Sequence, residues 1–385
     1  MTTGGIVCFG KDWDDDPTSN THVMRALAAD RRVLWLESIG MRVPRVGSPR
    51  DLRRIANRLS LAARAPRQVA PNLWIASPIL LPLPHSAGAT ALNRRLLRRT
   101  VARLARRLDL GRYELWTFLP NTAAYADALD PDLVVYYCVD NWAASRGYDG
   151  ARLAALEQDL CRRADVVFGT SRTLVAARSA VNPETHLATH GVDHAHFARA
   201  LAPETLVAPE VAALPKPVLG VVGLLDDRID VALLDRLARE HPEWTIALVG
   251  TVALDPAPLA RHANVRFLGR QPYARLPAIL KGFAAGLVPF VVNDYTRDIN
   301  PVKAREYLSA GLPVIGTALP EIAALGEAVA ATDHADFIAA VARAIRDDTP
   351  ARRTARSTAM AGETWAQRVV ALRAHVARVR GARAA

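Results

Sequence analysis

Two polar clusters of the sequence combine residue types that bind phosphate and sugar hydroxyl groups. The first is Gly223-Leu-Leu-Asp-Asp-Arg228, which follows an apolar segment typical of a buried strand and precedes a helical pattern. A glycine at that point lets a ligand approach the backbone, and a helix N-terminus attracts anions. Arg228 adds a guanidinium that fits a phosphate. An ordinary strand-to-helix turn with a capping Asp and a surface Arg would have the same composition, so the cluster alone leaves both interpretations open.

The second cluster is Asp298-Ile-Asn-Pro-Val-Lys-Ala-Arg-Glu306, which leads from a polar loop into a helix. Asn300 and the proline after it predict the helix start, with Asn as the cap and Pro in the first turn. Lys303 lies in that first turn, where its charge opposes the helix dipole, which favours an anion-binding role. Glu306 is three residues further on the same face. A carboxylate there can accept both hydroxyls of a ribose while the lysine neutralises a diphosphate; the alternative is a surface Lys–Glu pair.

Candidates for acid–base chemistry lie in the N-terminal half. Asp140 ends the apolar segment LVVYYCVD, and a carboxylate at the carboxyl end of a strand is a plausible general base. It equally suits the cap of the next helix. The weaker candidates for a base are Glu37, His22 and Asp12. Asp12, Trp13 and Trp142 are further candidates for ligand contact in the same half. The two tryptophans could stack on sugar rings, although a large aromatic near a loop covers a core as often.

Strands and helices alternate along both halves of the chain, which predicts an α/β fold with two doubly wound, Rossmann-like parallel sheets. Ligands of such sheets bind at the carboxyl ends of the strands, where both clusters and Asp140 fall. The segment 198–217 contains four prolines and little periodicity, so we expect the interdomain linker there. The expected domains are 1–200, 201–362, and a C-terminal helix over 363–385 that returns toward the N-terminal domain.

Three segments of the C-terminal half resemble glycosyltransferases of the GT-B type, specifically family 4 or group 1. HGVDHAHF (190–197) is similar to their N-G-V-D-x-x-x-F hinge signature, with His in place of Asn. NVRFLGRQPYARLPAIL (264–280) resembles the segment beside their nucleotide base, and REYLSAGLPVIGT (305–317) their E-x-x-x-x-G-x-P-V-I element. Bacterial surface-polysaccharide, teichuronic-acid-type transferases look most similar. The resemblance implies two domains facing across a cleft, with the donor in the C-terminal domain.

The resemblance also implies roles for individual residues. Glu306 matches the carboxylate that binds the donor ribose, and Arg228 matches an arginine that contacts phosphate. Asp298 stands eight residues before Glu306, where retaining members have a glutamate near the donor sugar. The lysine that often follows the family's arginine is absent, since Ile and Asp occupy those positions, and Lys303 is the expected substitute. We expect no cofactor and no metal, with UDP or GDP as the nucleotide; the run Asp14-Asp15-Asp16 has the composition of a metal site but lies in the first loop.

The charge of +11 is unevenly distributed, with arginines concentrated in residues 50–67 and 94–107. Either a solvated helix surface or a basic amphipathic face on anionic lipid fits this pattern. Nucleic acid is not expected, because no recognition motif accompanies the charge. The three cysteines are widely separated and lie in apolar stretches, so we expect core thiols without disulfides. With no apolar run long enough for a membrane span and no signal-peptide pattern, a cytoplasmic location is expected, with a peripheral place on the inner face of the membrane as the alternative.

The predicted function is transfer of a sugar from a nucleotide-diphosphate donor to a hydroxyl of a glycan or lipid-linked acceptor, in cell-surface polysaccharide synthesis. Two alternatives share the fold: a nucleotide-sugar 2-epimerase and a non-catalytic glycan-binding protein. Release of free nucleotide distinguishes them, because an epimerase releases it only as a side product and a binding protein releases none.

Overall fold

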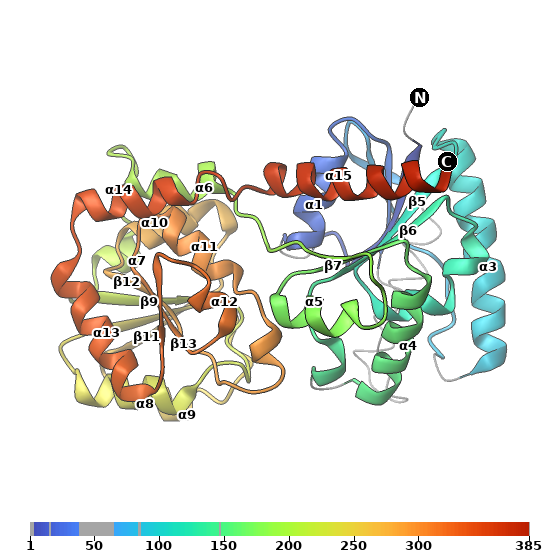
Figure 1. Ribbon diagram of the computed structural model, residues 1–385. Helices are drawn as coiled ribbons and strands as arrows, with labels where there is room; N and C mark the ends of the chain where they lie inside the picture. The colour runs from blue at the N-terminus through green and yellow to red at the C-terminus, as the bar shows by residue number, and fades with distance from the viewer. Residues whose placement is uncertain (1–3, 15–16, 38–64, 84–85, 146–147, 385) are drawn as a thin grey trace. The chain divides into compact units, whose positions relative to one another are not determined.

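The computed structural model describes residues 4–14, 17–37, 65–83, 86–145 and 148–384 (Figure 1). The chain forms two compact units. Unit 1 contains residues 1–189 and 368–385, and unit 2 contains residues 190–367. The chain therefore passes from one unit to the other twice, after residue 189 and after residue 367. The predicted domain borders, after 200 and after 362, both lie inside unit 2.

The described part of unit 1 is built on an eight-stranded sheet in the order β3-β4-β2-β1-β5-β6-β7-β8. All neighbouring strands are parallel except β3 and β4, which are antiparallel at one edge. The strands are β1 (Gly5–Phe9), β2 (Val33–Leu36), β3 (Arg67–Ala70), β4 (Leu73–Ala76), β5 (Tyr113–Thr117), β6 (Leu133–Cys138), β7 (Val166–Gly169) and β8 (Thr185–Leu187). Strands β1, β2 and β7 are buried along their whole length, as expected of parallel strands covered on both faces.

Helices connect the strands of unit 1. They are α1 (Ser19–Leu27), α3 (Ala87–Arg107), α4 (Gly150–Arg163) and α5 (Arg172–Ser179), with short 3₁₀ turns at η1 (Pro120–Ala124), η2 (Ala126–Leu129) and η3 (Trp142–Ala144). Apolar side chains of α3 pack with those of β1, β2 and β5 in one core cluster. The three cysteines are free and buried, as predicted.

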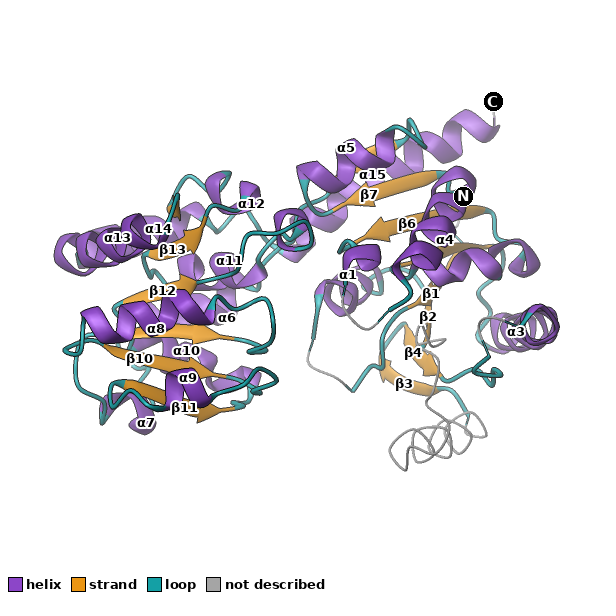
Figure 2. Cartoon of the chain, turned by 90° about the horizontal axis from the view of Figure 1, so that it is seen from below, coloured by secondary structure: helices purple, strands orange, loops and turns teal. Residues whose placement is uncertain are grey.

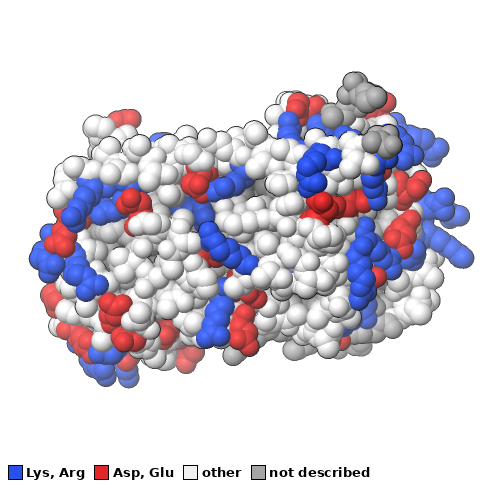
Figure 3. Space-filling model, in the orientation of Figure 1, with Lys and Arg blue, Asp and Glu red and all other residues white. Residues whose placement is uncertain are grey.

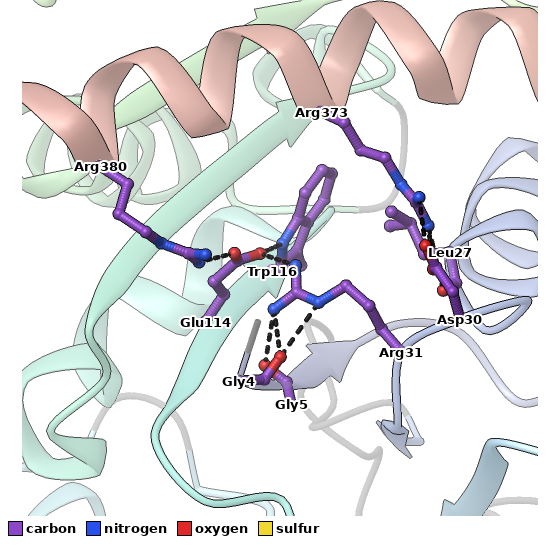
Figure 4. Close-up of polar contacts among 9 residues, drawn as sticks. All are labelled: Gly4, Gly5, Leu27, Asp30, Arg31, Glu114, Trp116, Arg373 and Arg380. Atoms are coloured by element: carbon purple, nitrogen blue, oxygen red, sulfur yellow. Dashed lines mark hydrogen bonds and ion pairs between the residues drawn. The ribbon is translucent and has the colours of Figure 1, made fainter. Parts of the chain in front are cut away.

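The C-terminal helix α15 (Trp365–Ala384) packs on unit 1, as predicted, through arginines that pair with carboxylates near the amino ends of the strands. Arg373 pairs with Asp30, which leads toward β2, and Arg380 pairs with Glu114 on β5 (Figure 4). Glu114 is buried and also accepts hydrogen bonds from Arg31 at 2.8 Å and from the Trp116 indole at 2.7 Å. Helix α15 therefore lies along the edge of the sheet opposite to the carboxyl ends.

The described residues of unit 2 form a six-stranded parallel sheet in the order β11-β10-β9-β12-β13-β14 (Figure 2). Its strands are β9 (Val218–Val222), β10 (Thr245–Val249), β11 (Val265–Gly269), β12 (Ala285–Val288), β13 (Val314–Thr317) and β14 (Ala328–Ala331). Alternate residues of a strand face opposite sides, so Val218 and Val222 belong to one core and Leu219 and Val221 to another. Two cores, one on each face, confirm the doubly wound architecture.

The helices of unit 2 divide between these two cores. The elements are α6 (His194–Ala198), η4 (Arg199–Leu201), α7 (Pro209–Ala212), α8 (Val231–Glu240), α9 (Ala257–Ala260), η5 (Tyr273–Arg275), α10 (Leu276–Lys281), η6 (Thr296–Asp298), α11 (Val302–Ser309), α12 (Pro320–Ala323), α13 (His334–Asp347) and α14 (Pro350–Ala359). The segment expected to link the domains packs on unit 2, because Ala208 and Val211 are buried in its core. One of its four prolines, Pro209, starts a short helix there.

Candidate functional site

The two predicted polar clusters of unit 2 meet at the carboxyl end of the sheet. The loop after β9 reaches α11 at Gly223, where an added Cβ atom would lie 3.7 Å from Cε of Lys303. Gly250 follows the neighbouring strand β10 with φ of +150°, and a Cβ atom there would lie 1.7 Å from the carbonyl oxygen of Gly223. Only glycine permits this approach of the two loops. The result is a half-buried backbone edge next to a lysine at the start of a helix.

Tyr307 fixes α11 to the end of β9. Its buried hydroxyl accepts a hydrogen bond from the backbone N–H of Val222 at 2.7 Å. The ring fits because residue 286 on β12 is glycine, where a Cβ atom would lie 2.4 Å from Cδ2 of Tyr307. Burial raises the pKa of this phenol, so it remains a neutral tether. The tether sets the position of Lys303 and Glu306, which share the helix.

Lys303 and Glu306 form an ion pair, with Nζ 2.6 Å from Oε2. The glutamate side chain is 9% exposed and the lysine side chain 32% exposed. The carboxylate is therefore nearly enclosed, while part of the ammonium faces solvent at the N-terminus of α11. A ligand anion that reaches the lysine would meet a cation and free backbone N–H groups together, which is an arrangement suited to a phosphate.

Arg228 is held in place by two contacts on the other side of the β9 loop. Its Nε donates to Oδ1 of Asp226 at 2.8 Å, and its guanidinium lies over the ring of Phe290, 5.7 Å from the centroid. The backbone carbonyl of Arg228 also accepts from Val291 at 2.8 Å, which ties the loop to the segment after β12. These contacts hold the guanidinium in one orientation while its side chain stays 26% exposed.

The loop before α11 differs from the prediction at its cap. The helix begins at Val302 with Pro301 in the capping position and no side-chain cap. Asn300 is buried instead: its amide donates to Oε2 of Glu321 at 3.1 Å, and its oxygen accepts from Arg305. The assignment of Asn300 as helix cap was wrong, because the buried partners on α12 and α11 compete for its side chain. Asp298 ends η6 and is half-buried.

In unit 1, Glu37 and Trp13 meet at the carboxyl ends of β2 and β1. Glu37 accepts a hydrogen bond from the backbone N–H of Trp13 at 3.2 Å and another from the hydroxyl of Ser77. Trp13 is buried against Trp35, with ring centroids 5.1 Å apart in a T-shaped arrangement, and Arg25 lies over it. This Trp13 therefore covers the core in the described structure, and Glu37 holds two loops together.

The remaining candidates of unit 1 lie along the same edge. Asp140 follows β6 and is half-buried, and the turn after it is capped by the side chain of Asn141. Trp142 packs edge-on against Tyr148, with ring centroids 6.4 Å apart, and its buried indole nitrogen has no hydrogen-bond partner among the described residues. Asp12 is exposed in the loop after β1, and His22 is half-buried on α1.

The strand order separates these candidates into two groups. Glu37 follows β2 and Asp140 follows β6, and β1 and β5 lie between those strands. At about 4.8 Å per strand the two carboxylates are roughly 14 Å apart, too far to act on one proton. Asp140 and Glu37 are therefore alternatives for a base and not a pair.

The described residues contain no cluster of three or more His, Cys, Asp or Glu side chains suited to a metal ion. Asp14 is exposed and pairs with Arg67 at 2.7 Å, while Asp15 and Asp16 lie outside the described residues. None of the described helices has the length and apolar character required to cross a bilayer.

Three features of the site were not anticipated from the sequence: the tether by Tyr307, the glycine pair at 223 and 250, and the ring of Phe290 under Arg228. Gly250 carries the same signal as Gly223, since each directly follows an apolar strand. Tyr307 and Phe290 carry no local signal, because their roles depend on strands that are distant in sequence.

Comparison with known proteins agrees with this architecture. Residues 216–347, which contain the whole unit 2 site, match the family described as "Glycosyl transferases group 1". The fold of the chain is GT-B, the fold of the solved glycosyltransferases it resembles. Both findings confirm the resemblance drawn from the three motifs.

Individual relatives extend beyond the matched segment. TuaH of Bacillus subtilis (strain 168), named for a glycosyltransferase role in teichuronic acid biosynthesis, is 27% identical over 252 residues; the match covers 59% of this chain and 62% of TuaH. Alpha,alpha-trehalose 6-phosphate synthase of Burkholderia multivorans superposes with a TM-score of 0.70 at 14% identity, covering 99% of both chains. HepE of Anabaena, solved in complex with UDP, gives 0.65 at 14% identity, covering 98% of this chain and all of HepE.

Proposed function

We propose that this protein transfers a sugar from a nucleotide-diphosphate donor to a hydroxyl of a glycan or lipid-linked acceptor in the synthesis of a cell-surface polysaccharide. The observation that carries the proposal is the Lys303–Glu306 pair beside Gly223, at the carboxyl edge of the unit 2 sheet and inside the segment that matches group 1 glycosyltransferases. The relationship to TuaH supports the polysaccharide, and the UDP complex of HepE supports UDP as the first nucleotide to test.

Donor binding divides between the two members of the ion pair. The enclosed carboxylate of Glu306 accepts the hydroxyls of the ribose, and Lys303 turns from Glu306 to the diphosphate. The absence of a side chain at Gly223 lets the diphosphate approach the backbone closely. Arg228, oriented by Asp226 and Phe290, contributes a second cation. Asp298 faces the donor sugar, and Asn300 holds the loop that carries it, through Glu321 and Arg305.

The chemical step breaks the bond between the sugar C1 and the diphosphate oxygen. Negative charge develops on the leaving diphosphate, and fixed cations and helix-terminal N–H groups stabilise it without a metal ion. The acceptor hydroxyl forms the new bond to C1 and loses its proton. In an inverting reaction Asp140 takes that proton; in a retaining reaction the leaving diphosphate takes it, and Asp140 orients the acceptor. Asp12, Trp13 and Trp142 belong to the acceptor side of this proposal.

Thermal-shift screening against UDP-, GDP- and ADP-sugars, followed by measurement of nucleotide release, tests the proposed function. We expect one nucleotide class to raise the Tm and its sugar to be turned over with stoichiometric release of the nucleoside diphosphate when acceptor is present. Binding without any release would favour a glycan-binding protein, and conversion of the nucleotide sugar to its 2-epimer would favour an epimerase. A place on the inner face of the membrane, where lipid-linked acceptors are found, is part of the same proposal.

A further inference from the structure

The arginines of unit 1 fall into two groups with different surroundings. On α15, Arg373, Arg378, Arg380 and Arg383 each pair with a carboxylate of another element. On α3, six arginines are exposed and make no hydrogen bond or ion pair among the described residues: Arg95, Arg98, Arg99, Arg103, Arg106 and Arg107. A protein surface that only needs solubility carries both signs of charge interspersed. Since the α3 arginines have no such partner in the described part of unit 1, the packing seen there does not require them.

The six arginines lie on one face of α3. Their spacing of three and four residues keeps them on adjacent turns, opposite the buried side chains Leu97, Val101 and Leu104. The helix has 21 residues and is thus about 30 Å long, so the charges form a continuous stripe. Figure 3 shows Lys and Arg side chains gathered at the edge of unit 1 where α3 lies in Figure 1.

Exposed apolar side chains adjoin this stripe at its N-terminal end. Leu92 lies on the arginine face of α3 and is 44% exposed. The segment just before the helix adds Ile79, Leu81 and Leu83, exposed by 47%, 42% and 53%. Two hydrogen bonds between the backbone of Leu81 and the buried side chain of Asn93, at 2.8 and 3.0 Å, fix this segment to the helix. The hydrogen bonds of Leu81 therefore fix this segment with its leucines exposed to solvent.

We propose that this basic-apolar face, formed by the six arginines of α3 with Ile79, Leu81, Leu83 and Leu92, docks on a membrane surface that contains anionic lipids. Arginines placed over negative headgroups and leucines inserted at the acyl boundary are the two components of interfacial binding. Dimerisation through this face is disfavoured, because it would place two positively charged stripes against each other. Exposed leucines do not contribute to nucleic-acid binding, and this face contributes no aromatic side chain for base stacking.

The proposal rests on the proposed function in one respect, because a lipid-linked acceptor would explain why the protein binds a membrane. Vesicle binding itself is measured without any sugar transfer. The test compares the full chain with the variant Arg95→Ser/Arg98→Ser/Arg99→Ser/Arg103→Ser in co-sedimentation with vesicles of phosphatidylglycerol and phosphatidylcholine. Arg94 is left unchanged because it donates to the carbonyl of Ala124 at 2.9 Å. At about fivefold per charge near the surface, the four changes should weaken binding by two to three orders of magnitude.

A matched variant removes the same charge elsewhere. Serine at the exposed positions Arg162, Arg239, Arg346 and Arg352 should leave vesicle binding within a few fold of the unmodified chain. A second variant, Leu81→Ser/Leu83→Ser/Leu92→Ser, should lose binding that persists at high salt, because it removes the uncharged component. Nucleotide affinity of all three variants, measured by thermal shift, reports that unit 2 is intact.

Three results would overturn the proposal. One is equal vesicle binding by the unmodified chain and the four-arginine variant. Another is binding of the chain to DNA or RNA with no binding to anionic vesicles. The third is a concentration-dependent dimer that the arginine variant abolishes. If the unmodified chain binds anionic vesicles as expected but turns over no nucleotide sugar, the result would count against the proposed function and leave this inference standing.

Discussion

Replacing either member of the Lys303–Glu306 pair separates the roles assigned to them. In the absence of ligand the two side chains pair at 2.6 Å, with the lysine side chain 32% exposed and the glutamate side chain 9% exposed. Glu306→Gln keeps a polar group in the enclosed position and should cost little stability, whereas Lys303→Met leaves the carboxylate enclosed without its cation and should cost more. The contact each makes with a donor is charge-assisted, and its loss should cost about 1.5–3 kcal/mol of binding. The expected rise in Kd for UDP is therefore roughly 10- to 150-fold for Glu306→Gln and for Lys303→Met.

Ligands that lack either the second phosphate or the ribose hydroxyls show which part of the nucleotide each residue binds. Glu306→Gln should weaken UMP and UDP equally and should change little for a UDP analogue without ribose hydroxyls. Lys303→Met should weaken UDP far more than UMP. Titration calorimetry measures these affinities, and GDP replaces UDP if screening selects it. Glu240→Gln, which removes a more exposed ion pair with Arg236 at 2.7 Å on α8, is the control for loss of a helix-surface pair and should leave all affinities unchanged. Wild-type affinity and turnover in both site variants would refute the placement of the donor.

Three further outcomes follow from the structure. If the product is inverted, Asp140→Asn should lower turnover by about 10²–10⁴-fold with donor affinity nearly unchanged; an inverting enzyme that keeps full activity in this variant would transfer attention to Glu37 or His22. Excess EDTA should leave turnover unaltered, and an activity lost to EDTA and restored by Mg²⁺ would contradict the metal-free proposal. Burial, aided by the positive charge of neighbouring His186 and Arg378, lowers the pKa of His375 on α15, so the folded chain binds this proton less readily than the unfolded chain. The contribution of neutral His375 to the free energy of unfolding is complete above the unfolded pKa of about 6.5 and is lost as the pH falls below that value. The drop in Tm from about pH 7.5 to about pH 5.5 should therefore be smaller in His375→Phe.

Much of the alternation of elements in unit 2 was predictable because strands such as Val218–Val222 and Thr245–Val249 are short apolar runs and helices such as Val231–Glu240 have one buried and one exposed face. Two strands that lack a long apolar run lie at the edges of the sheets. Arg67–Ala70 is half polar and exposed, and Ala328–Ala331 consists of alanine and one valine. Such segments pair on one side only, so neighbouring strands and not local propensity decide their conformation.

The site was predictable at the level of residue types but not of partners. Spacing along a helix brought Lys303 and Glu306 together, and the structure confirms their contact. Asn300 was placed as a cap because local chemistry favours it, whereas the fold supplies a buried carboxylate, Glu321, 21 residues later. A distant partner of this kind has no local sequence signal. The same limit applies to Phe290, which lies under the guanidinium of Arg228 although 62 residues separate them.

The most direct test of the donor site is hydrogen–deuterium exchange of the full chain with and without saturating nucleoside diphosphate. The account predicts slower exchange in two peptides of unit 2, the loop that contains Gly223 and Arg228 and the start of α11 around Lys303, with β11 and the sheet core little changed. Slower exchange in those two peptides that disappears in Glu306→Gln at the same nucleotide concentration would support the assignment fully. Nucleotide binding that leaves both peptides unchanged would contradict it.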